Sequence, residues 1–144
     1  MGAMNIVVLD GQGGGVGRLL VQAIKAELPA ARVTALGTNA MATAAMLKAG
    51  ADQGATGENA VRVGCASADV IVGVVAILRA NAMLGEITPA MALAVSESRA
   101  EKVLLPMERC GVRIVGVQRQ TLDASAREAA ALVRRLSEQN QEVS

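Results

Sequence analysis

A run of glycines near the start of the chain carries the clearest sign of chemistry in this sequence. It lies between an apolar run at 5–9 and a helical pattern of apolar residues at 16–28. Where a strand passes into a helix, unpaired backbone N–H groups and the helix dipole favour an anion, and glycine lets a phosphate approach the backbone. Another phosphate-bearing ligand and a purely structural turn are the alternatives. We predict that the phosphates of a nucleotide bind to Asp10, Gly11, Gln12, Gly13, Gly14, Gly15, Val16 and Gly17.

The spacing of these glycines distinguishes between the known phosphate-binding patterns. The P-loop pattern is absent, because no lysine followed by a hydroxyl residue comes after the glycines. The dinucleotide pattern with glycines at positions 1, 3 and 6 fails, because its sixth position falls on Val16 or Arg18. The spacing Gly11-x-x-x-Gly15-x-Gly17 resembles the loop of short-chain dehydrogenases, a Rossmann-fold family that binds NAD or NADP. We therefore expect NAD(P) or an adenine nucleotide as the ligand.

The composition limits what such a site could catalyse, because the chain has no Phe, Tyr, Trp or His. Histidine catalysis, imidazole metal sites and aromatic platforms for nucleic-acid bases are excluded. The tyrosine and lysine pair of the short-chain dehydrogenases is excluded as well. The acidic residue that dinucleotide folds place after the second strand is replaced by Thr38 and Asn39, which could bond a ribose or a 2′-phosphate.

Two further polar residues fall where they could face the glycine run. Glu86 and Thr88 lie at a predicted helix start after a buried strand. Asp10 with Glu86 could hold Mg²⁺ on a nucleotide phosphate, because this cation prefers carboxylate oxygens. The alternative is that Thr88 only caps its helix and Glu86 only complements the helix dipole.

The hydrophobic pattern predicts the elements that position these residues. We expect strands at 5–9, 32–36, 70–75, 102–105 and 113–117, and helices at 16–28, 40–49, 60–66, 88–99 and 122–138. Residues 52–59 read as a polar connection, with Thr56 capping the next helix, and 74–88 stays unassigned. Near-continuous apolar strands alternating with helices predict a Rossmann-like, doubly wound α/β fold. Its mainly parallel sheet has about five strands in the order 3-2-1-4-5, with helices on both faces.

Other features of the sequence concern the domain bounds, the partners and the cellular location. We expect a single domain at 4–138, a vector-derived remnant at 1–3 and a frayed tail at 139–144. The formal net charge of +1 and the interrupted apolar runs predict no nucleic-acid partner and no membrane span. Cys65 and Cys110 read as two ordinary thiols of a cytoplasmic protein. The seven methionines read as core fillers, with an exposed patch for a homodimer as the alternative.

Longer motifs extend over nearly the whole chain. They are the glycine run, Gly37-Thr38-Asn39, the segment 46–60 and the segment 84–92. Together they resemble an uncharacterised family of small bacterial proteins, a domain of unknown function found mostly in anaerobic Gram-positive species. The resemblance implies a bacterial cytosolic protein and brings no activity with it.

Three hypotheses about function remain open at this point. The first is a small protein that binds a nucleotide on the glycine run. The second is a non-catalytic module for ligand sensing or assembly, and the third is an enzyme acting on a phosphorylated metabolite. Catalysis would have to rely on the cofactor, a thiol, or the side chains of Asp10, Lys48, Glu58 or Glu86.

Overall fold

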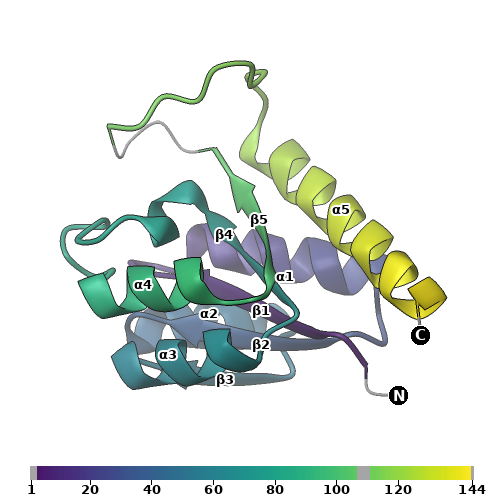
Figure 1. The fold of residues 1–144 in the computed structure, drawn as a ribbon, viewed down its shortest axis with the longest axis horizontal. Coiled ribbons are helices and arrows are strands. Elements are labelled where there is room, and N and C mark those ends of the chain that lie inside the picture. The colour runs from purple at the N-terminus through teal and green to yellow at the C-terminus, as the bar shows by residue number, and fades with distance from the viewer. Residues whose placement is uncertain (1–2, 107–110, 144) are drawn as a thin grey trace.

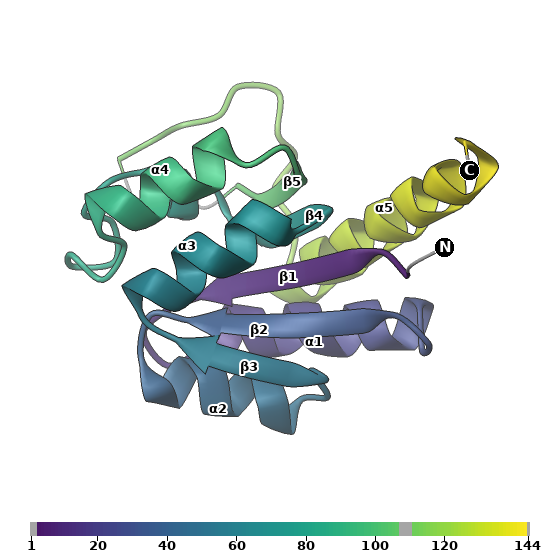
Figure 2. The same cartoon turned by 60° about the horizontal axis from the view of Figure 1, so that its bottom comes forward.

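The central element is a parallel sheet of five strands in the order β3-β2-β1-β4-β5. We analysed a computed structural model, which describes residues 3–106 and 111–143. The strands are β1 (Asn5–Asp10), β2 (Arg32–Gly37), β3 (Gln53–Thr56), β4 (Val70–Val74) and β5 (Glu101–Leu105). Figure 2 shows β1 at the centre, between β2 and β4. The predicted α/β class and strand order are confirmed.

Helices cover both faces of this sheet. The helices α1 (Gly15–Glu27), α2 (Ala40–Lys48) and α5 (Leu122–Val143) lie on one face, where α1 packs between the other two (Figure 1). The helices α3 (Glu58–Ser67) and α4 (Pro89–Glu97) lie side by side on the opposite face. A short 3₁₀ helix, η1 (Val75–Leu78), follows β4 directly. The fold is thus doubly wound, as the alternating pattern predicts.

The core consists of small aliphatic side chains in close contact. Every residue of β4 is buried, and β1 is buried from Ile6 onward, which explains their unbroken apolar sequences. Helix α3 approaches the sheet closely at Gly64, where a Cβ would lie 2.6 Å from the Cδ1 atom of Leu36. Without rings to fill gaps, the layers must come this near to reach normal packing density.

Several predicted boundaries are wrong. Residues 53–56, expected as a connection, form β3, and Thr56 does not cap α3. Gly57 is the N-cap, with φ of 103°, while the Thr56 hydroxyl lies 2.7 Å from that of Thr43. Residues 113–117, expected as a strand, are neither helix nor strand. Helix α5 continues to Val143, past the end expected at 138, whereas α4 ends at Glu97 instead of residue 99.

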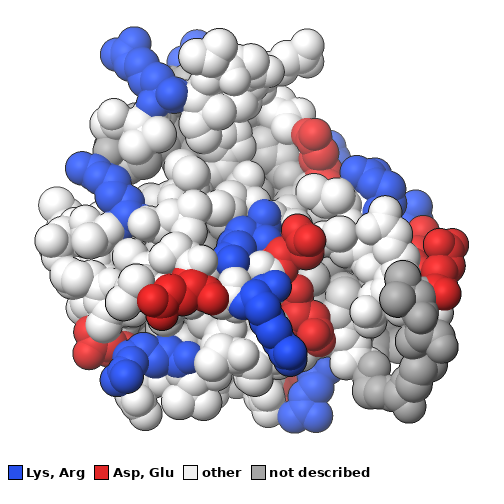
Figure 3. Space-filling view, viewed as in Figure 1, with Lys and Arg blue, Asp and Glu red and all other residues white. Residues whose placement is uncertain are grey.

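Charged side chains of both signs lie close together on the surface (Figure 3). Figure 3 shows acidic and basic side chains intermixed on the face that it presents. On α5, Arg127 pairs with Asp123 and Arg134 pairs with Glu138, each one helical turn apart. Among the described helices, none has the length and apolar character to cross a membrane.

The sulfur-containing side chains divide between core and surface. Cys65 is fully buried and free, as expected, whereas Cys110 lies outside the described residues. Met46 and Met91 are buried in the core and fill it as predicted. Met41 is exposed on α2, so the prediction that it fills the core is wrong.

Candidate functional site

Three segments meet at the carboxyl edge of the sheet, where ligands bind in open α/β folds. The glycine run follows β1, residues 38–39 follow β2, and a loop at 79–88 follows β4 and η1. Because β1 lies between β2 and β4, the three segments are neighbours in space. The position beside β1 is the predicted topological switch point.

The glycine run turns sharply before α1 begins. Gly14 has φ of 74° and Gln12 has φ of 51°, and the amide of Gly14 donates to the carbonyl of Gly11 over 2.9 Å. A Cβ on Gly14 would lie 2.9 Å from the backbone of Ala42, so α2 also packs against this turn. The turn therefore requires glycine at this position for both its conformation and its contacts.

The other glycines of the run differ in what surrounds them. A Cβ on Gly17 would lie 2.5 Å from the Met46 sulfur, and one on Gly11 would lie 2.7 Å from the Thr38 hydroxyl. At Gly13 and Gly15 a Cβ would meet nothing within 4 Å. Gly11 and Gly17 thus allow close packing inside the protein, whereas Gly13 and Gly15 border open space.

The backbone N–H groups of the run divide in the same way. The amide of Gly17 donates to Asp10 Oδ2 over 2.7 Å, and the amide of Gln12 donates to Glu86 Oε1 over 2.8 Å. Within the described part of the chain, the amides of Gly13, Gly15 and Val16 have no acceptor. These three groups are the open donors at the start of α1, where the helix dipole adds positive potential.

Asp10 is a support of the glycine turn. Its side chain is only 5% exposed, and burial raises the pKa of its carboxyl group. Hydrogen bonds from the Gly17 and Gly11 amides oppose that rise in pKa, and the charge of Glu86 adds to it. Because Asp10 points at the first turn of α1, it ties the end of β1 to the helix.

Glu86 is the centre of the polar cluster at this edge. Its Oε1 atom accepts hydrogen bonds from the Gln12 amide, the Thr38 hydroxyl over 2.6 Å and the Asn39 side-chain amide over 2.9 Å. These bonds, that from Thr38 above all, hold the pKa of Glu86 below its usual value. Asn39 also caps α2 by accepting from the Ala42 amide over 2.9 Å, so its orientation is fixed.

The loop that presents Glu86 has an unusual backbone. Asn81, Met83 and Leu84 have φ between 57° and 66°, a region that non-glycine residues rarely adopt. The amide of Asn81 donates to the Ile87 carbonyl over 2.7 Å, which closes the loop at its base. The sequence pattern leaves this segment unassigned because such a conformation depends on contacts with the rest of the fold.

Thr88 lies apart from the Glu86 cluster. Its hydroxyl oxygen accepts from the Met91 amide over 3.2 Å and so caps α4, which confirms the capping alternative. The same hydroxyl donates to Glu58 Oε1 over 2.6 Å. Thr88 thereby joins the first turns of α3 and α4. No described hydrogen bond joins Thr88 to Glu86, Asn39 or the glycine run.

Comparison with known proteins places the chain in a family. The model of the domain of unknown function DUF3842 matches residues 5–138. The chain belongs to this family. A search of curated proteins gave no match. Among solved structures, the "crystal structure of AibC" matches with a TM-score of 0.51 and 24% identity. The match covers 93% of this chain and 42% of the AibC chain, and it shows a shared fold.

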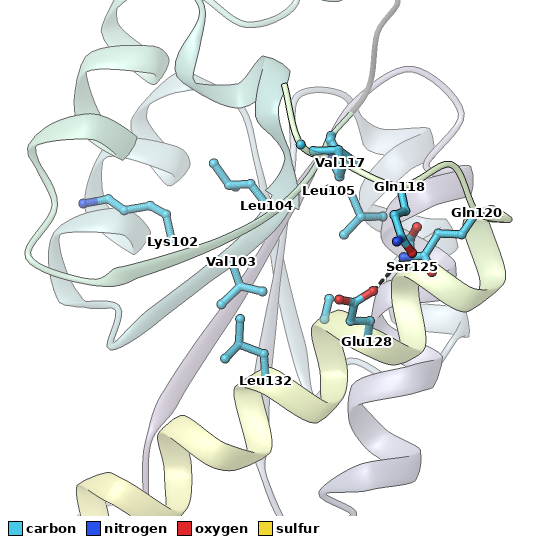
Figure 4. A pocket seen from close by; sticks show the side chains of 13 residues that line it. Lys102, Val103, Leu104, Leu105, Val117, Gln118, Gln120, Ser125, Glu128 and Leu132 are labelled. Atoms are coloured by element: carbon cyan, nitrogen blue, oxygen red, sulfur yellow. Dashed lines mark hydrogen bonds between the residues drawn. The ribbon is translucent and has the colours of Figure 1, made fainter. Parts of the chain in front are cut away.

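Two cavities of this DUF3842 domain lie away from the Glu86 cluster. One of about 650 Å³ lies between β5, the segment 116–120 and α5, and Figure 4 shows Gln120 bonded to Glu128 within it. A second, of about 580 Å³, is a groove between α3 and α4. No group of three or more His, Cys, Asp or Glu side chains able to hold a metal occurs in the described ranges. Neither cavity is lined by a predicted site residue.

Proposed function

We propose that the chain binds a nucleotide at the carboxyl edge of β1, with its phosphates on the amides of Gly13, Gly15 and Val16. One observation carries this proposal: these amides have no acceptor in the described chain, and the two glycines border open space. A phosphate supplies the acceptors that the amides lack and gains from the dipole of α1. The same edge of the sheet binds ligands throughout open α/β folds.

The position of Glu86 suggests that the group next to the phosphates is a ribose. Dinucleotide folds bond the ribose hydroxyls with an acidic residue after the second strand, and this chain has Thr38 and Asn39 there. The carboxylate of Glu86 reaches the same place from the loop after β4, because both side chains donate to its Oε1 atom. No described residue donates to Oε2, so this oxygen is open to a ribose hydroxyl.

The charge of Glu86 also discriminates between NAD and NADP. A carboxylate attracts a free 2′-hydroxyl as donor and repels a 2′-phosphate. The proposal therefore favours NAD or an adenine nucleotide over NADP. Mg²⁺ beside the phosphates stays a prediction, and Asp10 is a poor ligand for it because it is buried and bonded to Gly17.

The test is stabilisation of the purified protein by ligands. Thermal unfolding is followed with NAD, NADP, ATP and ADP, each at millimolar concentration. A ligand at 100 times its Kd stabilises by about 2.7 kcal/mol. We expect a rise in Tm with NAD or an adenine nucleotide, and a smaller rise with NADP. If none of the four raises the Tm, nucleotide binding is wrong.

Two variants locate the site if a ligand stabilises the protein. Gly15→Val places a side chain in the open space before the amides, where it would block a phosphate, and should abolish the rise in Tm. The fold should stay intact, because a Cβ at Gly15 meets no protein atom within 4 Å. Glu86→Gln removes the carboxylate charge and should narrow the difference between the rise in Tm with NAD and that with NADP. Ala44→Val, at an exposed position of α2, provides the control for an added side chain. Stabilisation that survives Gly15→Val would move the site elsewhere.

A ligand-controlled assembly module is the second candidate, and an exposed surface favours it. Val63 on α3 is 62% exposed and Leu93 on α4 is 55% exposed, side by side on one face. Turnover of the bound nucleotide would indicate an enzyme, whereas a change in oligomeric state without turnover would indicate the module. The cytoplasmic location and the homodimer stay predictions.

A further inference from the structure

The groove between α3 and α4 is lined by two matching stripes. Each helix contributes residues at positions i, i+3, i+4 and i+7, which lie on one helical face. The stripe on α3 is Asn59, Arg62, Val63 and Ala66, and the stripe on α4 is Ala90, Leu93, Ala94 and Glu97. Most of this lining is apolar, with alanine on both helices and the exposed side chains of Val63 and Leu93.

The groove carries one charge of each sign, on opposite helices. Arg62 lies on α3 and Glu97 on α4, and both line the groove and are exposed. Neither side chain forms an ion pair within the ranges that the structure describes. A largely apolar surface that carries two unpaired charges of opposite sign fits a partner surface that is apolar and carries the same two charges in reversed positions.

A second copy of this chain has that surface, since a two-fold interface brings the same patch of both subunits together. We propose that the chain forms a two-fold dimer through the α3–α4 face, with Arg62 against the partner's Glu97 and the reverse contact on the other side. This interface goes beyond nucleotide binding and does not depend on it.

The geometry of the helices fits this arrangement. Helices α3 and α4 both run from the carboxyl to the amino ends of the strands, so they are parallel (Figure 2). A two-fold axis along the groove places α3 of one copy over α4 of its partner. Arg62 then lies at the same height along the helices as the partner's Leu93. The partner's Glu97 lies one helical turn further along, within reach of the long arginine side chain. Val63 and Leu93 become the buried centre.

The interface would lie next to the proposed nucleotide site. Thr88 donates to Glu58 over 2.6 Å, which ties the first turns of the two helices together. Thr88 is also two residues from Glu86, the centre of the polar cluster. Because the axis runs along the groove, the N-termini of all four helices point the same way, and the dimer places both copies of the site at the same end of the four-helix layer.

The test is charge reversal followed by mixing. Sedimentation equilibrium of the unaltered protein should give a dimer. Arg62→Glu and Glu97→Arg each place like charges in both contacts, and each should weaken the dimer by about tenfold or more. Mixing the two variants restores opposite charges in both contacts, so the mixture should form a heterodimer. Arg127→Glu on α5 makes the same change of charge outside the groove and should leave the dimer intact.

The heterodimer keeps the proposal falsifiable even if one variant is destabilised, since a misfolded chain cannot restore association in its partner. Circular dichroism of each variant checks the helix content. A monomer at every concentration up to about 1 mM would overturn the proposal. Reversals that weaken the dimer no more than Arg127→Glu would overturn it too, as would a mixture that fails to associate. Loss of nucleotide binding would leave these outcomes unchanged.

Discussion

The Thr38 hydroxyl donates to the carboxylate of Glu86 over 2.6 Å, although the two residues are 48 positions apart in the sequence. This contact joins the end of β2 to the loop after β4 and passes over the end of β1. The bond to Gln12 fastens the glycine run to the same carboxylate. A single side chain thus ties together three segments at the edge of the sheet.

Replacing Glu86 by Gln should lower the stability in a pH-dependent way. The folded protein holds the pKa of Glu86 below its value in the unfolded chain, so ionised Glu86 stabilises the fold above the unfolded pKa of about 4.5. That stability is lost as the pH falls through the lower, folded pKa. We expect Glu86→Gln to cost about 1 kcal/mol at pH 7. The loss should shrink below pH 4 in urea unfolding, and an equal loss at both pH values would contradict the assignment.

The glycines should separate into two groups when they are replaced. Gly17→Ala places a Cβ against Met46 and Asp10 and should destabilise the fold by about 1–3 kcal/mol. Gly13→Ala and Gly15→Ala point into open space and should change the stability by less than about 0.5 kcal/mol. Urea unfolding of the three variants at one pH measures this difference. Equal losses in all three would mean that Gly13 and Gly15 also pack against the protein.

Asp10 should give a pH dependence of the opposite sign. Its folded pKa is raised, so the native chain holds a proton more tightly than the unfolded chain. Stability therefore falls as the pH rises from the unfolded pKa of 3.8 through the folded one. Asp10→Asn keeps an acceptor for the Gly17 amide and removes the buried charge, so this decline should disappear. Unfolding at pH 4 and pH 7 gives the slopes.

Asp52 offers a matched control for that measurement. A hydrogen bond from the Val33 amide lowers the pKa of Asp52, and Lys25 lies 3.1 Å from it. Asp52→Asn should therefore remove stability that is present above the unfolded pKa and lost as the pH falls. If Asp10→Asn and Asp52→Asn change the pH dependence of stability in the same direction, burial does not raise the pKa of Asp10.

The thiol of Cys65 should react only when the protein opens. Burial raises its pKa to about 11, from an ordinary value of 9.0, so its thiolate fraction at pH 8 is about a hundredfold lower. In a Cys110→Ser variant, labelling with a thiol reagent should be at least that much slower in buffer than in urea. Equal rates in buffer and urea would show that the α3 side of the core opens freely.

Much of the fold could be predicted from periodicity because its central strands are buried on both sides. The run from Ile6 to Leu9 is unbroken by polar residues, and so is that from Val70 to Val74. Strand β3 is the opposite case, since all four of its residues are exposed at the sheet edge and none is a large aliphatic. The segment 113–117 has strand-forming residues but no strand beside it, and propensity alone does not pair a strand.

The proximity of several candidate residues could be predicted, but not the contact that each of them makes. Position after a strand brought together Asp10, Thr38, Asn39 and Glu86, and the structure joins the last three in one cluster. That Gly17 packs inward while Gly15 borders open space depends on the direction of an absent Cβ, which spacing cannot give. The sequence predicts packing for Met83, but not that its sulfur lies where a Cβ on Gly11 would be only 2.8 Å away, because the loop that carries Met83 has no predicted conformation.

The ring-free core also has a spectroscopic consequence. Aromatic rings are the main source of the magnetic anisotropy that spreads methyl resonances in proteins, and this chain has none. Its buried Val, Leu, Ile and Met methyl groups should therefore crowd into a narrow region of the NMR spectrum. A bound purine or nicotinamide would then bring the sole aromatic rings into the molecule. The few methyl signals that it displaces would locate it on the protein directly.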